Sequence, residues 1–146
     1  MKPNQPWLNK KLFGIRNMLN VRTDAILVYS GTMPTTANGF TQAAHASNLL
    51  ATYRTTPVSY TIASADYSKL FLSKIPSAAT ASHTGTATWF ACTKLTTDSQ
   101  TAADSHVFIG EVSDLAGAGM LVFADAAFTQ GQSKGIYSFA FNISPL

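Results

Sequence analysis

Short runs of β-branched and aromatic residues recur along the chain from residue 25 onward, separated by turn-forming residues. The first run, AILVYS, is followed at once by Gly31 and Pro34, which break a strand and favour a turn. The pattern predicts about eight short strands, at residues 25–30, 48–54, 59–63, 69–75, 86–94, 106–112, 120–124 and 135–143. Strands at this spacing are typical of a β-sandwich or jelly roll, so the sequence predicts an all-β domain.

The apolar residues of these strands indicate the core. In 135–143, Tyr137, Phe139 and Phe141 alternate with smaller residues, which predicts one aromatic, buried face. Cys92 is expected to be a small buried residue. The predicted core residues are Ile26, Val28, Leu50, Ile62, Leu72, Trp89, Phe108, Val122, Phe139 and Phe141. Between strands, the alanine-rich stretch 40–47 is either a loop or a single helical turn, and we expect a loop. We also expect left-handed glycine conformations at Gly117 and Gly119.

The first 22 residues differ from the rest in charge. They hold five basic residues and no acid, which gives +5, whereas the remaining chain holds five basic and seven acidic residues, which gives −2. Leu8, Leu12, Ile15 and Leu19 fall on one face of a helix, so this segment is predicted to be an amphipathic arm. Its cations are either solvated on a helix packed against the body, or they anchor the chain to an acidic surface or nucleic acid. We therefore divide the chain into an arm at 1–22 and a β-sandwich domain at 23–146.

Charged residues make up only 12% of the chain, against about 25% in an average soluble domain. A surface of hydroxyl and methyl groups suits coverage by neighbouring molecules, so the composition favours assembly. The single Cys92 closes no intrachain disulfide, and no signal peptide or run of roughly 18 apolar residues is visible. The sparse arginines argue against a dedicated nucleic-acid reader.

The residues that usually carry catalysis are scattered. The seven acidic residues occur singly, His45, His83 and His106 are isolated, and no nucleophile motif or phosphate-binding loop is present. We therefore expect no enzyme activity, no metal site and no cofactor.

Five segments of the chain form a recognisable skeleton: VYSGTMPTTA at 28–37, NLLATY at 48–53, SHTGTATWFACTK at 82–94, HVFIGEVSD at 106–114 and GIYSFAFNIS at 135–144. Together they resemble a family of small virion proteins of tailed bacteriophages. The likeness extends from about Ala25 to Ile143, and its matching blocks are YSGTMP at 29–34 and GTATWF at 85–90. It implies a capsid decoration or cement protein that binds the major capsid protein. Such a protein is made in the host cytoplasm and is located on the capsid surface.

The arm lies outside the resemblance, and its role as an anchor is our own hypothesis. The expected contact residues are Trp7, Lys10, Lys11, Phe13 and Arg16, and other copies of the chain, as a dimer or trimer, are expected as partners. Two other functions remain open. One is a head-tail adaptor, tail or fibre-anchoring subunit. The other is a carbohydrate-binding β-sandwich that uses Tyr53, Tyr60 and Tyr67 as an exposed stacking platform.

Overall fold

The computed structural model describes residues 24–37, 40–55, 60–62, 69–72, 75–93 and 108–142. The longer strands in this part of the chain are β1 (Ala25–Ser30), β2 (Leu49–Arg54), β6 (Gly85–Thr93), β7 (Phe108–Ser113) and β11 (Ser138–Asn142). The shorter strands are β3 (Tyr60–Ile62), β4 (Lys69–Leu72), β5 (Ala79–Thr80), β8 (Leu121–Val122), β9 (Ala127–Phe128) and β10 (Ser133–Lys134). Each of the predicted strands overlaps one of these, so the described residues are predominantly β, as predicted.

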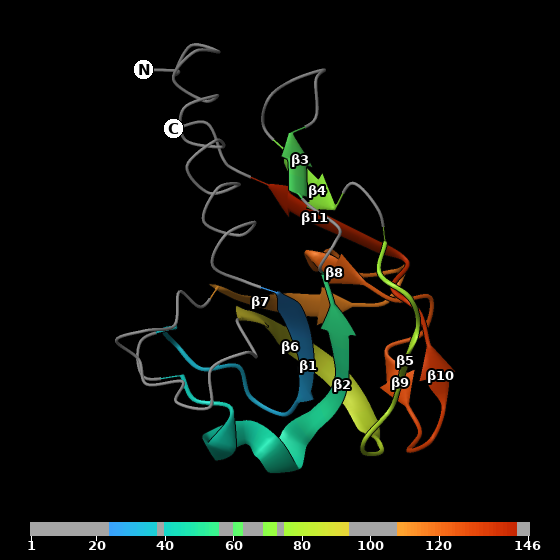
Figure 1. The fold of residues 1–146 in the computed structure, drawn as a ribbon. Coiled ribbons are helices and arrows are strands. Elements are labelled where there is room, and N and C mark those ends of the chain that lie inside the picture. Colours follow the sequence, from blue (N-terminus) through green and yellow to red (C-terminus); the bar gives the residue numbers. More distant parts are fainter. Residues whose placement is uncertain are drawn as a thin grey trace.

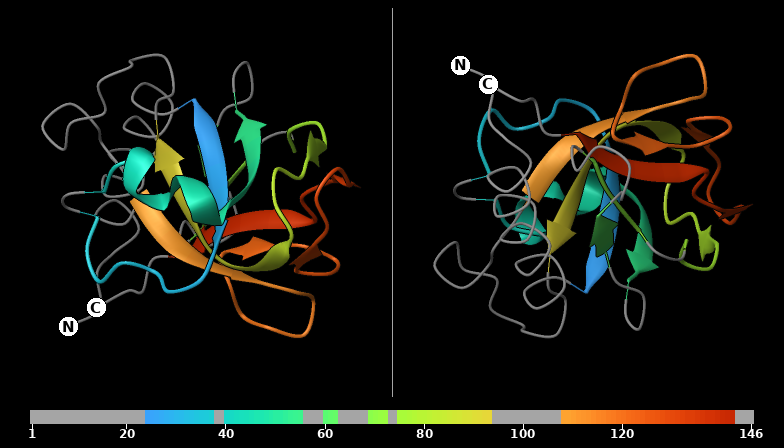
Figure 2. Two further views of the ribbon diagram at one scale, coloured as in Figure 1. Left: turned by 90° about the horizontal axis from the view of Figure 1, so that it is seen from below. Right: turned by 90° about the horizontal axis from the view of Figure 1, so that it is seen from above.

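The strands form one large curled sheet and a small one. The nine-stranded sheet has the order β2-β1-β6-β7-β8-β11-β4-β3, with β9 paired to β6, and β5 and β10 form a two-stranded sheet. The β7–β8 pair is parallel and the other pairs are antiparallel, so the large sheet is mixed. It curls into a half-barrel (Figures 1 and 2). Eight of the described strands follow one path through this sheet, with β9 off that path. The jelly-roll arrangement is not confirmed.

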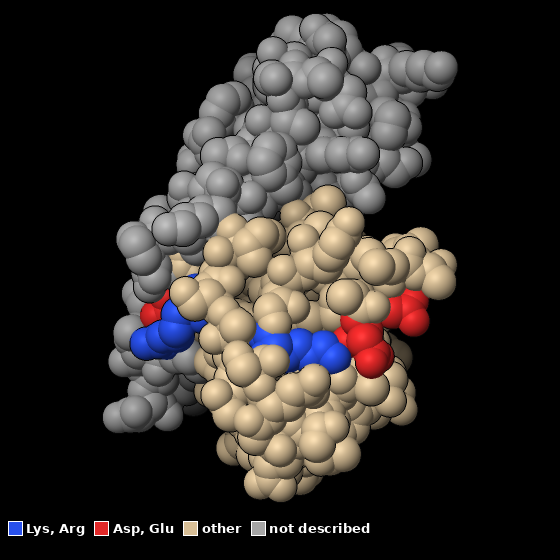
Figure 3. Space-filling view, turned by 90° about the vertical axis from the view of Figure 1, so that its right-hand side faces the viewer, with Lys and Arg blue, Asp and Glu red and all other residues tan. Residues whose placement is uncertain are grey.

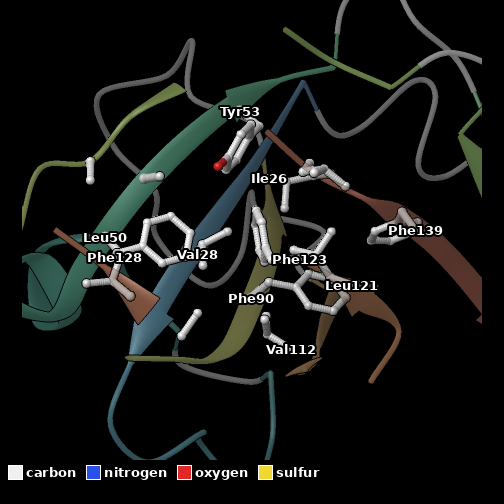
Figure 4. Packing of buried hydrophobic residues seen from close by; sticks show 14 of the residues in the cluster. Ile26, Val28, Leu50, Tyr53, Phe90, Val112, Leu121, Phe123, Phe128 and Phe139 are labelled. Atoms are coloured by element: carbon white, nitrogen blue, oxygen red, sulfur yellow. The ribbon is translucent and has the colours of Figure 1, made fainter. Parts of the chain in front are cut away.

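Two hydrophobic clusters lie on opposite faces of β1, because side chains alternate along a strand. Ile26 and Val28 belong to the inner cluster, which the half-barrel encloses (Figure 4). The inner cluster also contains Leu50, Ala51, Tyr53, Ala81, Ala87, Phe90, Cys92, Val112, Leu121, Phe123, Phe128, Ile136 and Phe139. Leu27 and Tyr29 belong to the outer cluster, together with Phe40, Trp89 and Ala91.

Burial confirms part of the predicted core. Ile26, Val28, Leu50, Trp89 and Phe139 are buried, as is Cys92, whereas Phe108 and Val122 are only half-buried. The side chains of Ile62, Leu72 and Phe141 lie outside the described residues. Tyr137 is 62% exposed and precedes β11, so the prediction that it shares the buried aromatic face is wrong. The strand β11 begins at Ser138, so Tyr137 lies in the connection from β10 and does not share the inward orientation of Phe139.

Two register shifts bend β1 and its neighbours. The pairing of β1 with β2 shifts between Val28 and Tyr29, and its pairing with β6 shifts between Tyr29 and Ser30. Each shift places an extra residue in the partner strand, which increases local bending and twist. In β6 the extra residue lets both Ala87 and Phe90, three positions apart, reach the inner cluster.

Two expectations for the connections are wrong. Residues 43–48 form a 3-10 helix, η1 (Ala43–Asn48), where the sequence analysis expects a loop. Alanine loses no side-chain entropy in a helix, and the hydroxyl of Thr41 accepts a hydrogen bond from Ala44 N at 3.3 Å. Among the described glycines, positive φ occurs at Gly31 and Gly131, so Gly117 and Gly119 do not have the predicted left-handed conformation.

Tyr53 connects β2 to the small sheet, since its hydroxyl donates a 2.7 Å hydrogen bond to Lys134 O. Burial raises the pKa of Tyr53, so the phenol remains a neutral donor. We expect Tyr53→Phe to lower the free energy of unfolding by about 0.5–1.5 kcal/mol, because the hydrogen bond is lost while the ring stays packed. Urea unfolding measures the change, with the exposed Tyr137→Phe as control. Equal stability of the two variants would show that this hydrogen bond contributes nothing.

Candidate interaction surface

The contact residues predicted in the arm lie outside the described residues. This applies to Trp7, Lys10, Lys11, Phe13 and Arg16, and the division at residue 22 falls there as well. Their role as an anchor therefore stays a prediction.

Among the described residues, no group of His, Cys, Asp or Glu is arranged to hold a metal ion. His45 packs with its ring parallel to that of Phe40, at 5.5 Å between centroids, and His83 hydrogen-bonds Leu49 O through Nδ1 at 2.7 Å. A carbonyl only accepts, so Nδ1 is the donor in this hydrogen bond. Both histidines thus have structural contacts. No helix in this part of the chain has the length and apolar character needed to cross a membrane.

The tyrosine platform proposed for a carbohydrate is incomplete. Tyr53 is 1% exposed, and its ring packs 5.9 Å from that of Phe123 in the inner cluster. It therefore has no face free for a sugar, and this expectation is wrong for Tyr53. The side chain of Tyr60 and the whole of Tyr67 lie outside the described residues.

The charged side chains are absent from one end of the described structure. The stretches 25–53, 75–93 and 126–133 contain no Asp, Glu, Lys or Arg. They supply η1, the β5–β6 turn at 81–84 and the β9–β10 turn at 129–132, which all lie at the lower end in Figure 1. On the face shown in Figure 3, the charged side chains of the described residues form a band across the middle, and the tan surface below this band carries none. We call these three segments the uncharged end.

The exposed residues of the uncharged end are small or carry neutral polar groups. They are Ala43, Ala44, Ala46, Ser47, Asn48, Ser82, His83, Thr84, Thr129, Gln130, Gly131 and Gln132. The charged pair nearest to β1 is at its opposite terminus, where Arg54 Nη1 lies 3.8 Å from Asp24 Oδ1. The low total charge is evident in the composition, but no sequence prediction placed the uncharged end. The signal that could have indicated it is the three long stretches without a charged residue.

Hydrogen bonds join the three segments of the uncharged end. Ser82 N donates to Leu50 O at 2.7 Å, which fixes the β5–β6 turn against the start of β2, directly after η1. Gln130 N donates to Thr84 Oγ1 at 3.0 Å, and Gly131 N donates to Ala81 O at 2.9 Å. Segments far apart in the sequence are therefore held as one surface.

The outer cluster supports this surface from behind. The Tyr29 and Trp89 rings stack at 4.3 Å between centroids, and the His45 ring of η1 meets Trp89 edge to face at 5.1 Å. The contacts of His45 and Phe40 with this stack hold η1 against the sheet, although η1 itself buries no residue. The η1 helix is therefore braced from behind by the aromatic rings of the outer cluster.

The two blocks that carry the phage resemblance meet behind the uncharged end. Trp89 Nε1 donates to Ser30 O at 3.2 Å, and the Thr88 hydroxyl donates to Gly31 O. Gly31 has φ +83°, so the turn after β1 uses a conformation that other residues rarely adopt. The residues of these blocks thus have structural roles. Comparison of the chain with family models, with curated proteins and with solved structures finds no match.

Proposed function

We propose that this protein is a structural, non-enzymatic component of a tailed-bacteriophage virion. In this proposal it is a decoration or cement protein that binds the outer surface of the major capsid protein shell and stabilises it. The observation that carries the proposal is the uncharged end, a surface of neutral small residues braced by backbone hydrogen bonds. The resemblance of residues 29–34 and 85–90 to small phage virion proteins is the reason for proposing a virion as the place where the protein acts.

Weak contacts suffice for such a role. A cement protein occupies many equivalent positions on a shell, so modest interfaces add up through multivalency. Low charge also reduces the cost of covering the protein surface, because few ions lose their hydration. In our proposal the arm at 1–22 contributes Trp7, Lys10, Lys11, Phe13 and Arg16 to the shell contact, and its +5 charge directs it to an acidic surface.

Deleting residues 1–22 tests the arm. We expect the truncated chain to lose most of its co-sedimentation with shells of the major capsid protein, and the intact chain to bind less tightly as salt rises. The body variant Ala116→Glu serves as a control, since it changes the charge of an exposed turn and leaves the arm intact. Unchanged shell binding after truncation, with an unaltered circular dichroism spectrum, would exclude the arm as the anchor.

Copy number tests the assignment to the shell. A decoration protein is present in hundreds of copies per particle, whereas a head-tail adaptor or tail subunit follows a ring symmetry of about three to twelve copies. Quantitative mass spectrometry of purified particles measures this number. A value in the lower range would contradict the decoration role and would indicate a neck or tail subunit.

The finer fold predictions belong to the same proposal. We retain the N-terminal amphipathic helix and a jelly-roll arrangement of the whole domain 23–146 as predictions. The half-barrel of the described residues agrees with a predominantly β domain. A structure of the protein bound to its shell tests both predictions.

A further inference from the structure

We infer that residues 40–48 form a detachable cover on the face of the large sheet that carries the outer cluster. These residues, which end in η1, move together away from the stacked rings of Tyr29 and Trp89 while the strands stay paired. We call residues 40–48 the cover. The inference goes beyond the proposed function, because it concerns a movement of the chain itself and requires no virion partner.

Two rings of the cover contact the aromatic stack. Phe40 lies 6.0 Å from Tyr29 and 6.1 Å from Trp89 between ring centroids, and His45 lies 5.9 Å and 5.1 Å from the same two rings. Phe40 is the only buried residue among residues 40–48, and none of the six residues of η1 is buried. Because burial of apolar area is the main force that holds a segment in place, the closed position depends chiefly on one side chain, Phe40.

The hydrogen bonds of the cover also permit it to move as a unit. His45 N donates to Gln42 O at 3.2 Å, which is a bond within the cover. In the described part of the chain, the bond that joins the cover to β1 runs from Ser30 Oγ to Asn48 O, at the long distance of 3.5 Å. Bonds within the cover persist when it leaves the sheet, whereas bonds to the sheet have to break. Opening therefore costs little hydrogen bonding, as is typical of segments that open locally.

The closed position leaves a polar group of the cover without a partner. Gln42 Nε2 is buried, and among the described residues it has no hydrogen-bond partner. A buried amide donor without an acceptor opposes the closed form, because the same group is hydrogen-bonded when it reaches water. The segment that contains the closing contact of Phe40 thus also contains a group that favours opening.

Opening changes the surface that the molecule presents. In the closed form Tyr29 and Trp89 are fully buried, and the exposed residues of η1 belong to the uncharged end. In the open form, the side of the stack that Phe40 and His45 contact faces water. The same end of the molecule therefore has a neutral closed surface and an aromatic open surface.

Hydrogen exchange at the indole of Trp89 tests the inference. Trp89 Nε1 is the donor to Ser30 O, and the ring is fully buried, so this proton exchanges when the cover opens or when the domain unfolds. The amide of Ala87, which donates to Ala126 O at 2.8 Å, reports unfolding of the sheet. We expect exchange measured by NMR to give a larger opening constant at Trp89 than at Ala87. We also expect low urea concentrations to leave the constant at Trp89 unchanged, because local opening exposes little surface.

Two substitutions are expected to shift the opening constant at Trp89 in opposite directions. Phe40→Ala removes the buried ring of the cover, so it is expected to raise the constant at least about tenfold. Gln42→Met keeps the length of the side chain and removes the buried donor, so it is expected to lower the constant about fivefold. The control is Tyr53→Phe, because Tyr53 belongs to the inner cluster on the opposite face of the sheet. Its opening constant at Trp89 is expected to stay within about twofold of that of the unchanged chain.

Two results would overturn the inference. One is an equal opening constant at Trp89 and Ala87 with the same dependence on urea, because the cover would then open only when the domain unfolds. The other is a Gln42→Met chain that opens as often as the unchanged chain. Should Phe40→Ala fail to fold, the unchanged chain and Gln42→Met decide by themselves, since both keep the buried ring. Shell co-sedimentation tests the proposed function separately, because the cover opens in the free protein.

Discussion

Replacing Trp89 by alanine is expected to lower the free energy of unfolding by about 3–5 kcal/mol, the loss typical of a large buried aromatic residue. Trp89 is fully buried and is the centre of the outer cluster. Its ring stacks on Tyr29 at 4.3 Å and meets Phe40 edge to face at 6.1 Å. The substitution therefore removes the apolar area of the indole together with its aromatic contacts and leaves a cavity.

The loss is expected to spread to the uncharged end. Trp89 Nε1 donates to Ser30 O, and the ring contacts His45 of η1, so alanine at this position removes the support of both the β1 turn and the helix. Urea unfolding followed by circular dichroism gives the change in free energy, and amide hydrogen exchange in η1 gives its local consequence. Trp89→Phe is the control, since it keeps an aromatic ring and loses the Nε1 donor. A loss below about 1 kcal/mol for Trp89→Ala would show that the outer cluster contributes little to stability.

The longer strands could be predicted because each is a run of β-branched and aromatic residues bounded by turn-forming residues. In β1 the residues from Ala25 to Tyr29 are all apolar and all buried, so the run predicts the strand. The sequence does not show that Leu27 and Tyr29 face a second, outer cluster. The two-residue strands β5, β9 and β10 carry no period. They are set by their partners across the fold, as in the pairing of Ser133 with Thr80. Sequence periodicity therefore could not find them.

The uncharged end could be predicted only in part, for a similar reason. The sequence shows directly that residues 25–53, 75–93 and 126–133 contain no charged side chain. These segments lie together at one end of the structure because of long-range hydrogen bonds, such as that from Gln130 N to Thr84 Oγ1, and no local sequence pattern predicts such bonds. Conversely, the arm is conspicuous in sequence because its charges and its helical period are both local. Local sequence patterns are therefore sufficient to predict the arm, whereas the uncharged end is formed by contacts between segments that are far apart in the sequence.

Gly119 is the described glycine whose replacement is expected to cost most. A Cβ added there would lie 2.7 Å from Ser113 N, 2.9 Å from Val112 C and 3.0 Å from Glu111 O. These are backbone atoms of β7, which cannot turn aside as a flexible side chain would. Met120 N donates to Glu111 O at 3.1 Å in the same place, so the chain must pass close to β7 for β8 to pair in parallel with it. Glycine is required at this position because the backbone of residue 119 passes close to the backbone of β7. It is not required for a positive φ.

We expect Gly119→Ala to lower the free energy of unfolding by about 3 kcal/mol, the upper part of the range for overpacking, because backbone has to move. Gly135→Ala is a matched control. No atom lies within 4 Å of a Cβ added at Gly135, and its φ lies outside the left-handed region. That variant is expected to be neutral or to gain up to about 1 kcal/mol from reduced freedom of the unfolded chain. Urea midpoints of the two variants at equal m-values measure the difference. If Gly119→Ala were as stable as Gly135→Ala, the close approach of the β7–β8 turn to β7 would be refuted, and with it the parallel pairing that joins β7 to β8 within the large sheet.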